Sequence, residues 1–282
     1  MYSFSMGVLL DSFRTDARTA MEQASELGLT GIQVYATKGA MSPEELTPAK
    51  RRAFLEMAKG YGLTISALCG DLGQGFGNGE KNPALIERSK RILDLAKDLE
   101  TSIVTTHIGV VPGDPNHDRY KVMQQACFSL AQYADSMQAH FAIETGPEPS
   151  AVLKTFLDGL HSTGVAVNLD PANLVMVTGD DPAQAVHNLS KYIVHTHAKD
   201  GRKLLERDPE IIYGVRSIEE VIEEGQAFIE LPLGAGDVNW SQYLKALDDI
   251  GYHGFLTIER EVGTDPAADI GKAVNFLHRY VK

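Results

Sequence analysis

The chain alternates short apolar runs with longer stretches whose apolar residues recur at helical spacing. The short runs are rich in Val and Ile, which favours strands, and the longer ones repeat about every 3.6 residues, as in amphipathic helices. The predicted strands are Phe4–Leu9, Gly31–Tyr35, Thr64–Cys69, Ile103–Ile108, Phe141–Thr145, Ala166–Leu169, Ile193–His197 and Phe255–Glu259. The predicted helices are Ala17–Leu27, Pro48–Gly60, Ala84–Leu99, Tyr120–Met137, Ser241–Ile250 and Ala267–Tyr280.

A glycine recurs between a predicted helix and the strand that follows it. It stands in ELGLTGIQVY, KGYGLTISAL, HSTGVAVNLD and DIGYHGFLTI. Because glycine tolerates the left-handed conformation in which many helices end, these segments indicate a weak repeat of strand and helix units. Strands that alternate with helices pair in parallel, and eight units close into a (β/α)8 TIM barrel of the α/β class. A doubly wound open sheet is the alternative, but its usual glycine-rich turn is missing from MGVLLDSFR.

Length and composition suit one barrel domain over residues 1–282. Hydrophobic residues make up 43% of the chain and charged residues 23%, which is typical of a globular protein with a large core. The region at about 200–238 is long for a connection between a strand and the next helix, so we expect it to shape specificity or an oligomer contact. Its acidic residues are interpreted as a solvated helix face; they are Glu206, Glu219, Glu220, Glu223 and Glu224.

Composition also bears on compartment and partners. No apolar stretch approaches the roughly 20 residues of a membrane helix, and the amino terminus lacks a signal-peptide pattern. Cys69 and Cys127 have no metal-type spacing, and we expect no disulfide between them. The net charge of -12 opposes binding to polyphosphate backbones. These features predict a cytoplasmic protein without nucleic-acid or membrane partners, and they leave a homo-oligomer open.

Five predicted strands end on side chains that can bind a metal or carry a proton. They are His107 in TTHIG, Glu144 in IETG, Asp170 in NLDPAN, His195 and His197 in HTHAKD, and Glu259 in TIERE. In a parallel barrel the carboxyl ends of the strands form the active site. Each residue alone has a structural explanation, since strand-end acids cap helices and single histidines often only make buried hydrogen bonds.

Together these residues predict a divalent metal ion. Three carboxylates in one barrel mouth would repel and desolvate one another unless a cation neutralised them. Three carboxylates and one imidazole, with water or substrate oxygens, suit Mn, Mg or Co better than a thiolate-rich zinc site. We favour Mn and keep Mg, Co and Zn as alternatives.

These motifs resemble the xylose isomerase-like superfamily of barrels, which includes ketose 3-epimerases, hydroxypyruvate isomerase, inosose dehydratase and the family IV endonucleases. The resemblance spans nearly the whole chain and rests on IETG, NLDPAN, HTHAKD, PLGAGDVNW and TIERE. It implies that Glu144, Asp170, His197 and Glu259 hold the metal. It also implies that the histidine before Ala-Lys-Asp is the ligand, which leaves His195 as a supporting or packing residue.

The chain departs from these relatives at two places. The three-metal endonucleases use further histidines where this chain has Cys69 and Asn173, which argues against a trinuclear zinc site. The ketose 3-epimerases tend to place a substrate-binding histidine where Asn173 stands. The hydroxyl pattern of the substrate therefore need not match theirs.

The expected reaction is proton transfer on a sugar or sugar derivative through an enediolate, as in an isomerase or epimerase. Glu144 and Glu259 are the expected base and acid, because two carboxylates beside a metal-chelated sugar can exchange its protons. His107, Asn173 and Lys199 are the expected substrate-binding residues. For His107 a role in orienting Glu144 is an equal alternative, and Lys199 could instead be a solvated loop residue.

Other reactions and other residues remain alternatives. A metal-dependent lyase or dehydratase on a keto-polyol, similar to inosose dehydratase, would use the same site, while an endonuclease IV-like nuclease or a noncatalytic sugar-binding barrel is less favoured.

The glycine-rich segment CGDLGQGFGNGEKN, with Phe76, is expected to close over the substrate. Arg260 is expected to point into the helix layer, Glu261 is a weak site candidate, and Trp240 is expected to pack at a helix start.

Overall fold

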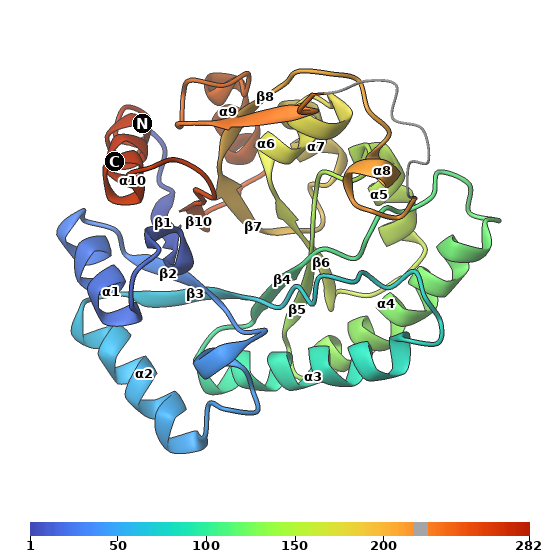
Figure 1. Ribbon diagram of the computed structural model, residues 1–282, viewed down its shortest axis with the longest axis horizontal. Coiled ribbons are helices and arrows are strands. Elements are labelled where there is room, and N and C mark those ends of the chain that lie inside the picture. Colours follow the sequence, from blue (N-terminus) through green and yellow to red (C-terminus); the bar gives the residue numbers. More distant parts are fainter. Residues whose placement is uncertain (217–224) are drawn as a thin grey trace.

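In the computed structural model, which describes residues 1–216 and 225–282, eight parallel strands close into a barrel (Figure 1). Around the barrel the strands follow the order β1-β10-β7-β6-β5-β4-β3-β2. The barrel strands are β1 (Ser5–Leu9), β2 (Gly31–Tyr35), β3 (Thr64–Cys69), β4 (Ile103–Thr106), β5 (His140–Glu144), β6 (Val165–Leu169), β7 (Ile193–Ala198) and β10 (Phe255–Ile258). All eight predicted strands are present, and the closed barrel rules out the open sheet.

Helices surround the barrel on its outer side (Figure 1). The main ones are α1 (Ala17–Glu26), α2 (Pro48–Gly60), α3 (Asn82–Asp98), α4 (Asp118–Ser136), α5 (Ser150–Asp158), α7 (Pro182–Asn188), α9 (Trp240–Asp249) and α10 (Pro266–Leu277). The six predicted helices are confirmed. The sequence did not reveal α5 and α7, because nine and seven residues are too few for a helical period to stand out.

Aspartates fix where several helices begin. The side chains of Asp16, Asp181 and Asp265 accept hydrogen bonds from backbone N–H groups in the first turns of α1, α7 and α10. Such capping satisfies donors that have no partner within the helix. The helices are thereby anchored at the end of the barrel where the strands finish and the connecting loops begin.

The strand register aims polar side chains into the barrel mouth. Parallel pairing sets Glu144 opposite Asn168 and Thr257 opposite His197. The register shifts between Val167 and Asn168, where β7 carries one extra residue, and a second shift lies between Ile32 and Gln33, opposite β3. Such irregularities re-aim side chains near active sites. Here they flank residues that contact His197, as described below.

A small antiparallel hairpin lies between β7 and α9. It pairs β8 (Asp200–Lys203) with β9 (Phe228–Leu231), and α8 (Pro209–Ile212) lies in the connection between them. The hairpin was not predicted. A second apolar cluster joins it to the segment after β6, where α6 (Pro171–Asn173) continues into a π-helix, η3 (Leu174–Thr178). The described parts of the region at about 200–238 therefore pack against the segment after β6.

Asp200 holds this hairpin in place. Its buried carboxylate accepts hydrogen bonds from the backbone N–H groups of Gly234 (2.9 Å) and Val238 (3.2 Å) and from Trp240 Nε1 (2.9 Å). Trp240 is buried at the start of α9, as expected. Glu206 is solvent-exposed as predicted, but it lies in a loop before α8 and not on a helix face; Glu219, Glu220, Glu223 and Glu224 lie outside the described residues.

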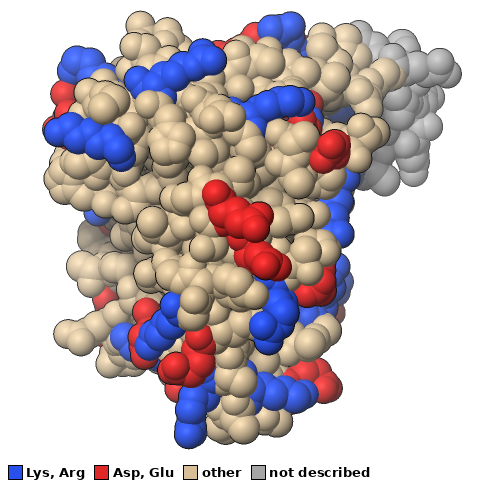
Figure 2. Space-filling model, turned by 90° about the vertical axis from the view of Figure 1, so that its left-hand side faces the viewer, with Lys and Arg blue, Asp and Glu red and all other residues tan. Residues whose placement is uncertain are grey.

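Two further observations concern the surface. Within residues 1–216 and 225–282, no helix combines the length and apolarity required to cross a membrane. Figure 2 shows one face of the molecule, on which Lys and Arg side chains alternate with Asp and Glu and gather into no continuous basic band.

Candidate metal centre

Four side chains converge at the carboxyl ends of neighbouring strands. Glu144 ends β5, Asp170 follows β6, His197 lies in β7 and Glu259 follows β10. All four are buried, and one potential ligand atom from each lies within 4.8 Å of the others. His197 Nδ1 is 3.3 Å from Asp170 Oδ2, 3.3 Å from Glu259 Oε2 and 3.6 Å from Glu144 Oε1. The fold thus brings together the four residues that the sequence singled out.

The charges in this cluster favour a cation. Burial by itself would lower the pKa of His197, but the negative charges of Glu259 and Glu144 raise it well above the ordinary value of 6.5. Burial would likewise raise the pKa of Glu259, yet the positive charges of Lys199 and His197 hold it well below its usual range. Positive charge is therefore favoured among these carboxylates, and a buried set of three carboxylates and one imidazole fits a divalent ion.

His197 is oriented by a glutamine from across the barrel. Its Nε2 is 2.9 Å from Gln33 Oε1, and Gln33 Nε2 donates to Thr105 Oγ1 over 2.8 Å. Because the amide oxygen can only accept, Nε2 carries a hydrogen, and Nδ1 is the ring nitrogen that faces the carboxylates and would bind a metal after losing its own proton. Such outer partners commonly fix the tautomer of a metal-binding histidine. Gln33 was missed from the sequence; its one signal is a polar residue inside the apolar run GIQVY.

His195 belongs to a hydrogen-bonded network that reaches the cluster through Asn168. Its Nδ1 donates to Asn168 Oδ1 (2.9 Å), and its Nε2 accepts from Thr257 Oγ1 (3.0 Å). Burial and the neighbouring charge of His197 lower the pKa of His195 well below 6.5, so the ring is neutral. Asn168 Nδ2, which lies 3.2 Å from His197 Nε2, donates to Glu144 Oε2 over 3.2 Å. This network supports the base of the cluster.

The two carboxylate oxygens of Asp170 have different partners, one in the backbone of α6 and the other in the metal cluster. Its Oδ1 accepts from the backbone N–H groups of Ala172 (2.8 Å) and Asn173 (2.9 Å), while Oδ2 faces His197. Asn173 Nδ2 in turn donates to Glu144 Oε1 over 3.1 Å. Gly146 permits this approach, because a Cβ there would lie 2.4 Å from the Asn173 Cβ. The loops after β5 and β6 thus position two of the carboxylates.

A polar cavity of about 290 Å³ opens above the cluster. The predicted substrate-binding residues His107, Asn173 and Lys199 all line it, together with Tyr35, Asp71, Tyr213, Phe228 and Glu230, which the sequence did not reveal. Tyr213, Phe228 and Glu230 come from the region at about 200–238. That region contributes to the wall of the cavity, as expected of a specificity-shaping insertion.

His107 bridges two carboxylates at the cavity wall. Its Nδ1 is 3.2 Å from Asp71 Oδ2, and its Nε2 is 3.7 Å from Glu144 Oε1. Burial opposes its protonation, but the charge of Glu144 and the hydrogen bond with Asp71 prevail and raise the pKa to about 9. The ring is therefore positioned both to orient Glu144 and to face the cavity.

Lys199 is not the solvated loop residue that was one alternative for it. Only 4% of the residue is exposed, and its Nζ lies 2.9 Å from Glu259 Oε2 and is paired with Glu261 as well. Burial would lower its pKa, but Glu259 and Asp170 raise it well above 10.5. A permanent positive charge thus stands beside one predicted ligand.

Two neighbouring expectations had different outcomes. Arg260 points into the helix layer as expected, where it pairs with Glu230 (2.6 Å) and Asp269 (3.0 Å). Phe76, in contrast, does not close over the cavity. It is buried in the core, edge-on to Phe141 with ring centroids 5.9 Å apart, because the glycine-rich loop folds down against the barrel wall.

A closed eightfold barrel with an active-site-like group of carboxylates and a histidine at its strand ends places the chain in the class of TIM-barrel proteins, and that group could hold a metal ion. Residues 21–280 match the family described as xylose isomerase-like TIM barrel, and the chain belongs to that family. Among curated proteins, none matches the chain in sequence.

Solved structures share the fold over nearly the whole chain. A xylose isomerase domain protein from Planctomyces limnophilus is 24% identical, with a TM-score of 0.78 and coverage of 99% of this chain and 96% of its own. The probable 3-DHS dehydratase AsbF from Bacillus anthracis is 16% identical (TM-score 0.74; 98% and 99% covered). A D-tagatose 3-epimerase-like protein is 17% identical (TM-score 0.73; 98% and 99% covered). At these identities the comparison shows the fold alone.

Proposed function

We propose that this protein is a metal-dependent isomerase or epimerase of a small carbohydrate. The observation that carries the proposal is the buried group of Glu144, Asp170, His197 and Glu259 beneath a polar cavity of about 290 Å³. A cavity of this size at the strand ends of a barrel suits one small polar molecule. Membership in the xylose isomerase-like family supports a sugar as that molecule.

The metal would be held by these four side chains, and Mn is favoured, with Mg, Co or Zn as alternatives. A divalent ion here would offset the negative charge that develops on a substrate when a proton next to its carbonyl is removed. The chain supports the binding geometry itself, since Gln33 orients His197 and the α6 backbone holds Asp170.

Glu144 and Glu259 would move the protons, one as base and the other as acid. They come from strands that are separated in the barrel by β6 and β7, so they reach the cavity from different directions. Each is held by donors: Asn168 and Asn173 contact Glu144, and Lys199 contacts Glu259. These contacts limit the rotation of both carboxylates, which helps to hold them in position for general acid–base catalysis.

Three further residues would bind the substrate. His107, Asn173 and Lys199 line the cavity and carry N–H groups that can donate to hydroxyl or carbonyl oxygens. The lining also contains the acidic residues Asp71, Glu230 and Glu261, which can accept from sugar hydroxyls. The cavity therefore suits a neutral or weakly acidic polyhydroxylated ligand.

A lyase or dehydratase acting on a keto-polyol is the second candidate. The fold is shared with a probable 3-DHS dehydratase, and removal of a proton next to a carbonyl is the first step of both reactions. The two differ in whether a hydroxyl group then leaves.

A nuclease is disfavoured. The net charge of -12 opposes binding to a duplex, and Cys69 and Asn173 stand where further metal-binding histidines would be needed. The mixed charges of the face in Figure 2 agree with this view.

Within the same proposal, the protein works in the cytoplasm, where its buried free thiols Cys69 and Cys127 would stay reduced.

The test is proton exchange in deuterated water with the Mn-loaded protein and a panel of ketoses, keto-polyols and sugar phosphates. The proposal predicts deuterium at the carbon next to the carbonyl of one substrate and no loss of water. Elimination of water would establish the lyase instead. The absence of exchange on every compound, with metal bound, would contradict both.

A further inference from the structure

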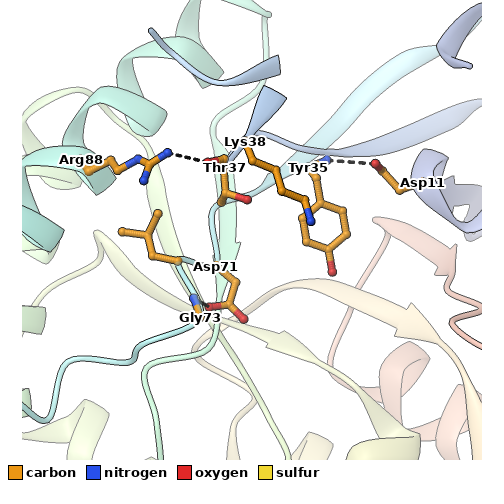
Figure 3. Close-up of a pocket in the computed structure, with 8 residues that line it drawn as sticks. Asp11, Tyr35, Thr37, Lys38, Asp71, Gly73 and Arg88 are labelled. Carbon is orange, nitrogen blue, oxygen red and sulfur yellow. Dashed lines mark hydrogen bonds between the residues drawn. The ribbon is translucent and has the colours of Figure 1, made fainter. Parts of the chain in front are cut away.

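A second and larger cavity adjoins the one above the metal cluster. Its volume is about 590 Å³, and its lining comprises Asp11, Tyr35, Thr37, Lys38, Asp71, Leu72, Gly73 and Arg88 (Figure 3). Tyr35 and Asp71 line both cavities. The two spaces therefore meet at these side chains, and a ligand held over the metal cluster could extend between them.

The outer cavity is built from the same end of the barrel as the inner one. Asp11 follows β1, Thr37 and Lys38 follow β2, and Asp71 to Gly73 follow β3, whereas Arg88 reaches in from α3. Arg88 Nη2 donates to the Thr37 carbonyl oxygen over 2.6 Å and so ties α3 to the loop after β2 (Figure 3). The wall is a defined part of the fold.

Fixed polar groups stand at the boundary between the two cavities. Asp71 Oδ1 accepts from the backbone N–H of Gly73 (2.8 Å), and its Oδ2 contacts His107 (3.2 Å), so the carboxylate is held from both sides. The backbone N–H of Tyr35 is 3.3 Å from Asp11 Oδ2. An aromatic ring beside oriented carboxylates offers an apolar surface for ring C–H groups and acceptors for hydroxyls.

The charges of the outer cavity do not favour an anionic group. Its lining holds two carboxylates, Asp11 and Asp71, against two cations, Lys38 and Arg88. The guanidinium of Arg88 is already engaged by the Thr37 carbonyl and lies 3.9 Å from Glu44. The lining therefore has no net positive charge to attract a phosphate or carboxylate. A neutral group with many hydroxyls meets both donors and acceptors.

The volumes of the two cavities also favour a ligand with a second sugar ring. Small-molecule sites typically measure about 300–1,000 Å³. The inner cavity, at about 290 Å³, has room for little beyond the reacting sugar, while the outer one, at about 590 Å³, can take a further ring.

We infer that the substrate carries a second sugar ring, which lies in the outer cavity while the keto-bearing unit reacts over the metal cluster. The inference rests on the proposed function and names its substrate class: a keto-sugar joined to another sugar through a glycosidic bond that passes between Tyr35 and Asp71. Asp11, Thr37 and Lys38 contact the second ring only and thereby set specificity.

The test compares matched pairs of ligands on the Mn-loaded protein. Free fructose is paired with the disaccharides lactulose, turanose and isomaltulose, in which fructose bears a second ring, and fructose 6-phosphate serves as the anionic counterpart. Calorimetric titration gives affinity, and deuterium incorporation gives kcat/KM. The inference predicts that at least one disaccharide exceeds fructose about 10-fold or more in affinity, the scale of one or two added hydrogen bonds.

Substitutions in the outer cavity distinguish its contribution to binding from that of the inner cavity. Lys38→Ala and Asp11→Asn, which keeps an oxygen for the backbone of Tyr35, should each weaken disaccharide binding about 3- to 10-fold and leave fructose unaffected. Lys97→Ala, an exposed lysine elsewhere on α3, is the matched charge control and should change neither.

Each outcome supports or contradicts the second-ring inference. Equal affinities for fructose and every disaccharide, no binding of any disaccharide, or a Lys38→Ala effect confined to fructose 6-phosphate would overturn the second-ring inference. Tighter binding of a disaccharide without deuterium exchange would support the second-ring inference and contradict the proposed isomerase. Deuterium exchange on fructose alone would support the proposed isomerase and contradict the second-ring inference.

Discussion

The hydrogen bond from His197 to Gln33 gives a prediction that can be worked out from the structure. Gln33 is 1% exposed, and its Oε1 is 2.9 Å from His197 Nε2. Gln33→Met keeps the approximate size of the side chain but removes the acceptor. His197 Nε2–H would then lie buried without this partner, and the ring would lose the contact that turns Nδ1 toward the carboxylates.

The expected loss is in metal affinity. Removing an outer partner of a metal-binding histidine typically costs about 10- to 100-fold in affinity, equivalent to about 1.4–2.8 kcal/mol. We expect a loss in this range for Mn binding by Gln33→Met, measured by competition with a fluorescent chelator. At saturating metal, metal-dependent stabilisation should shrink by about 1.4–2.8 kcal/mol, because stabilisation follows the logarithm of the ratio of metal concentration to Kd.

Thr105→Val is the matched control. Thr105 Oγ1 accepts from Gln33 Nε2 and donates to the Leu68 carbonyl oxygen (3.5 Å), so this variant leaves the Gln33 oxygen facing His197. Its metal affinity should stay within about 3-fold of wild type, the effect of less than one hydrogen bond. A Gln33→Met protein that is folded and binds Mn as tightly as wild type would refute the positioning role of Gln33.

Three other predictions address catalysis and stability. Glu144→Gln and Glu259→Gln should each lower kcat by about 10²- to 10⁴-fold, the usual contribution of acid–base catalysis, and His107→Ala should cost less; a Gln variant with near wild-type kcat would reduce that glutamate to a ligand. Burial raises the pKa of Glu148 from 4.5 to about 8, so the folded state holds this proton more tightly and its stability should fall as pH rises from 4.5 to 8, by at most about 5 kcal/mol. Urea unfolding at pH 5 and pH 8 should show that this fall is absent from Glu148→Gln, and an equal fall in both proteins would exclude the assignment. Asp200→Ala should destabilise the protein by about 3 kcal/mol or more in urea unfolding, because it strands buried donors; a change below about 1 kcal/mol would show that the hairpin does not depend on it.

The barrel could be predicted because its signals are local. Runs such as SIVTTHIGV identify a strand without knowledge of its neighbours, and the alternation with helices fixes parallel pairing. Glu144, Asp170, His197 and Glu259 were accessible for the same reason. Each ends or follows a strand, and parallel strand ends in a barrel must meet at one face.

The remaining site residues depend on contacts between distant parts of the chain. Gln33 reaches His197 across the barrel from a position beside a register shift, and neither the contact nor the shift leaves a mark in the sequence. Lys199 looks like a loop residue until Glu259 and Glu261 are seen to enclose it. The pairing of β8 with β9 likewise joins segments separated by a long connection, so local patterning did not reveal it.

Metal analysis can show whether Glu144, Asp170, His197 and Glu259 bind one divalent ion. The protein is stripped with a chelator, reloaded with Mn, freed of excess metal and analysed beside His197→Ala treated in the same way. The account predicts about one ion per wild-type chain, a marked loss in the variant, and metal-dependent thermal stabilisation in the wild type only. Equal metal content and equal stabilisation in the two proteins would contradict it.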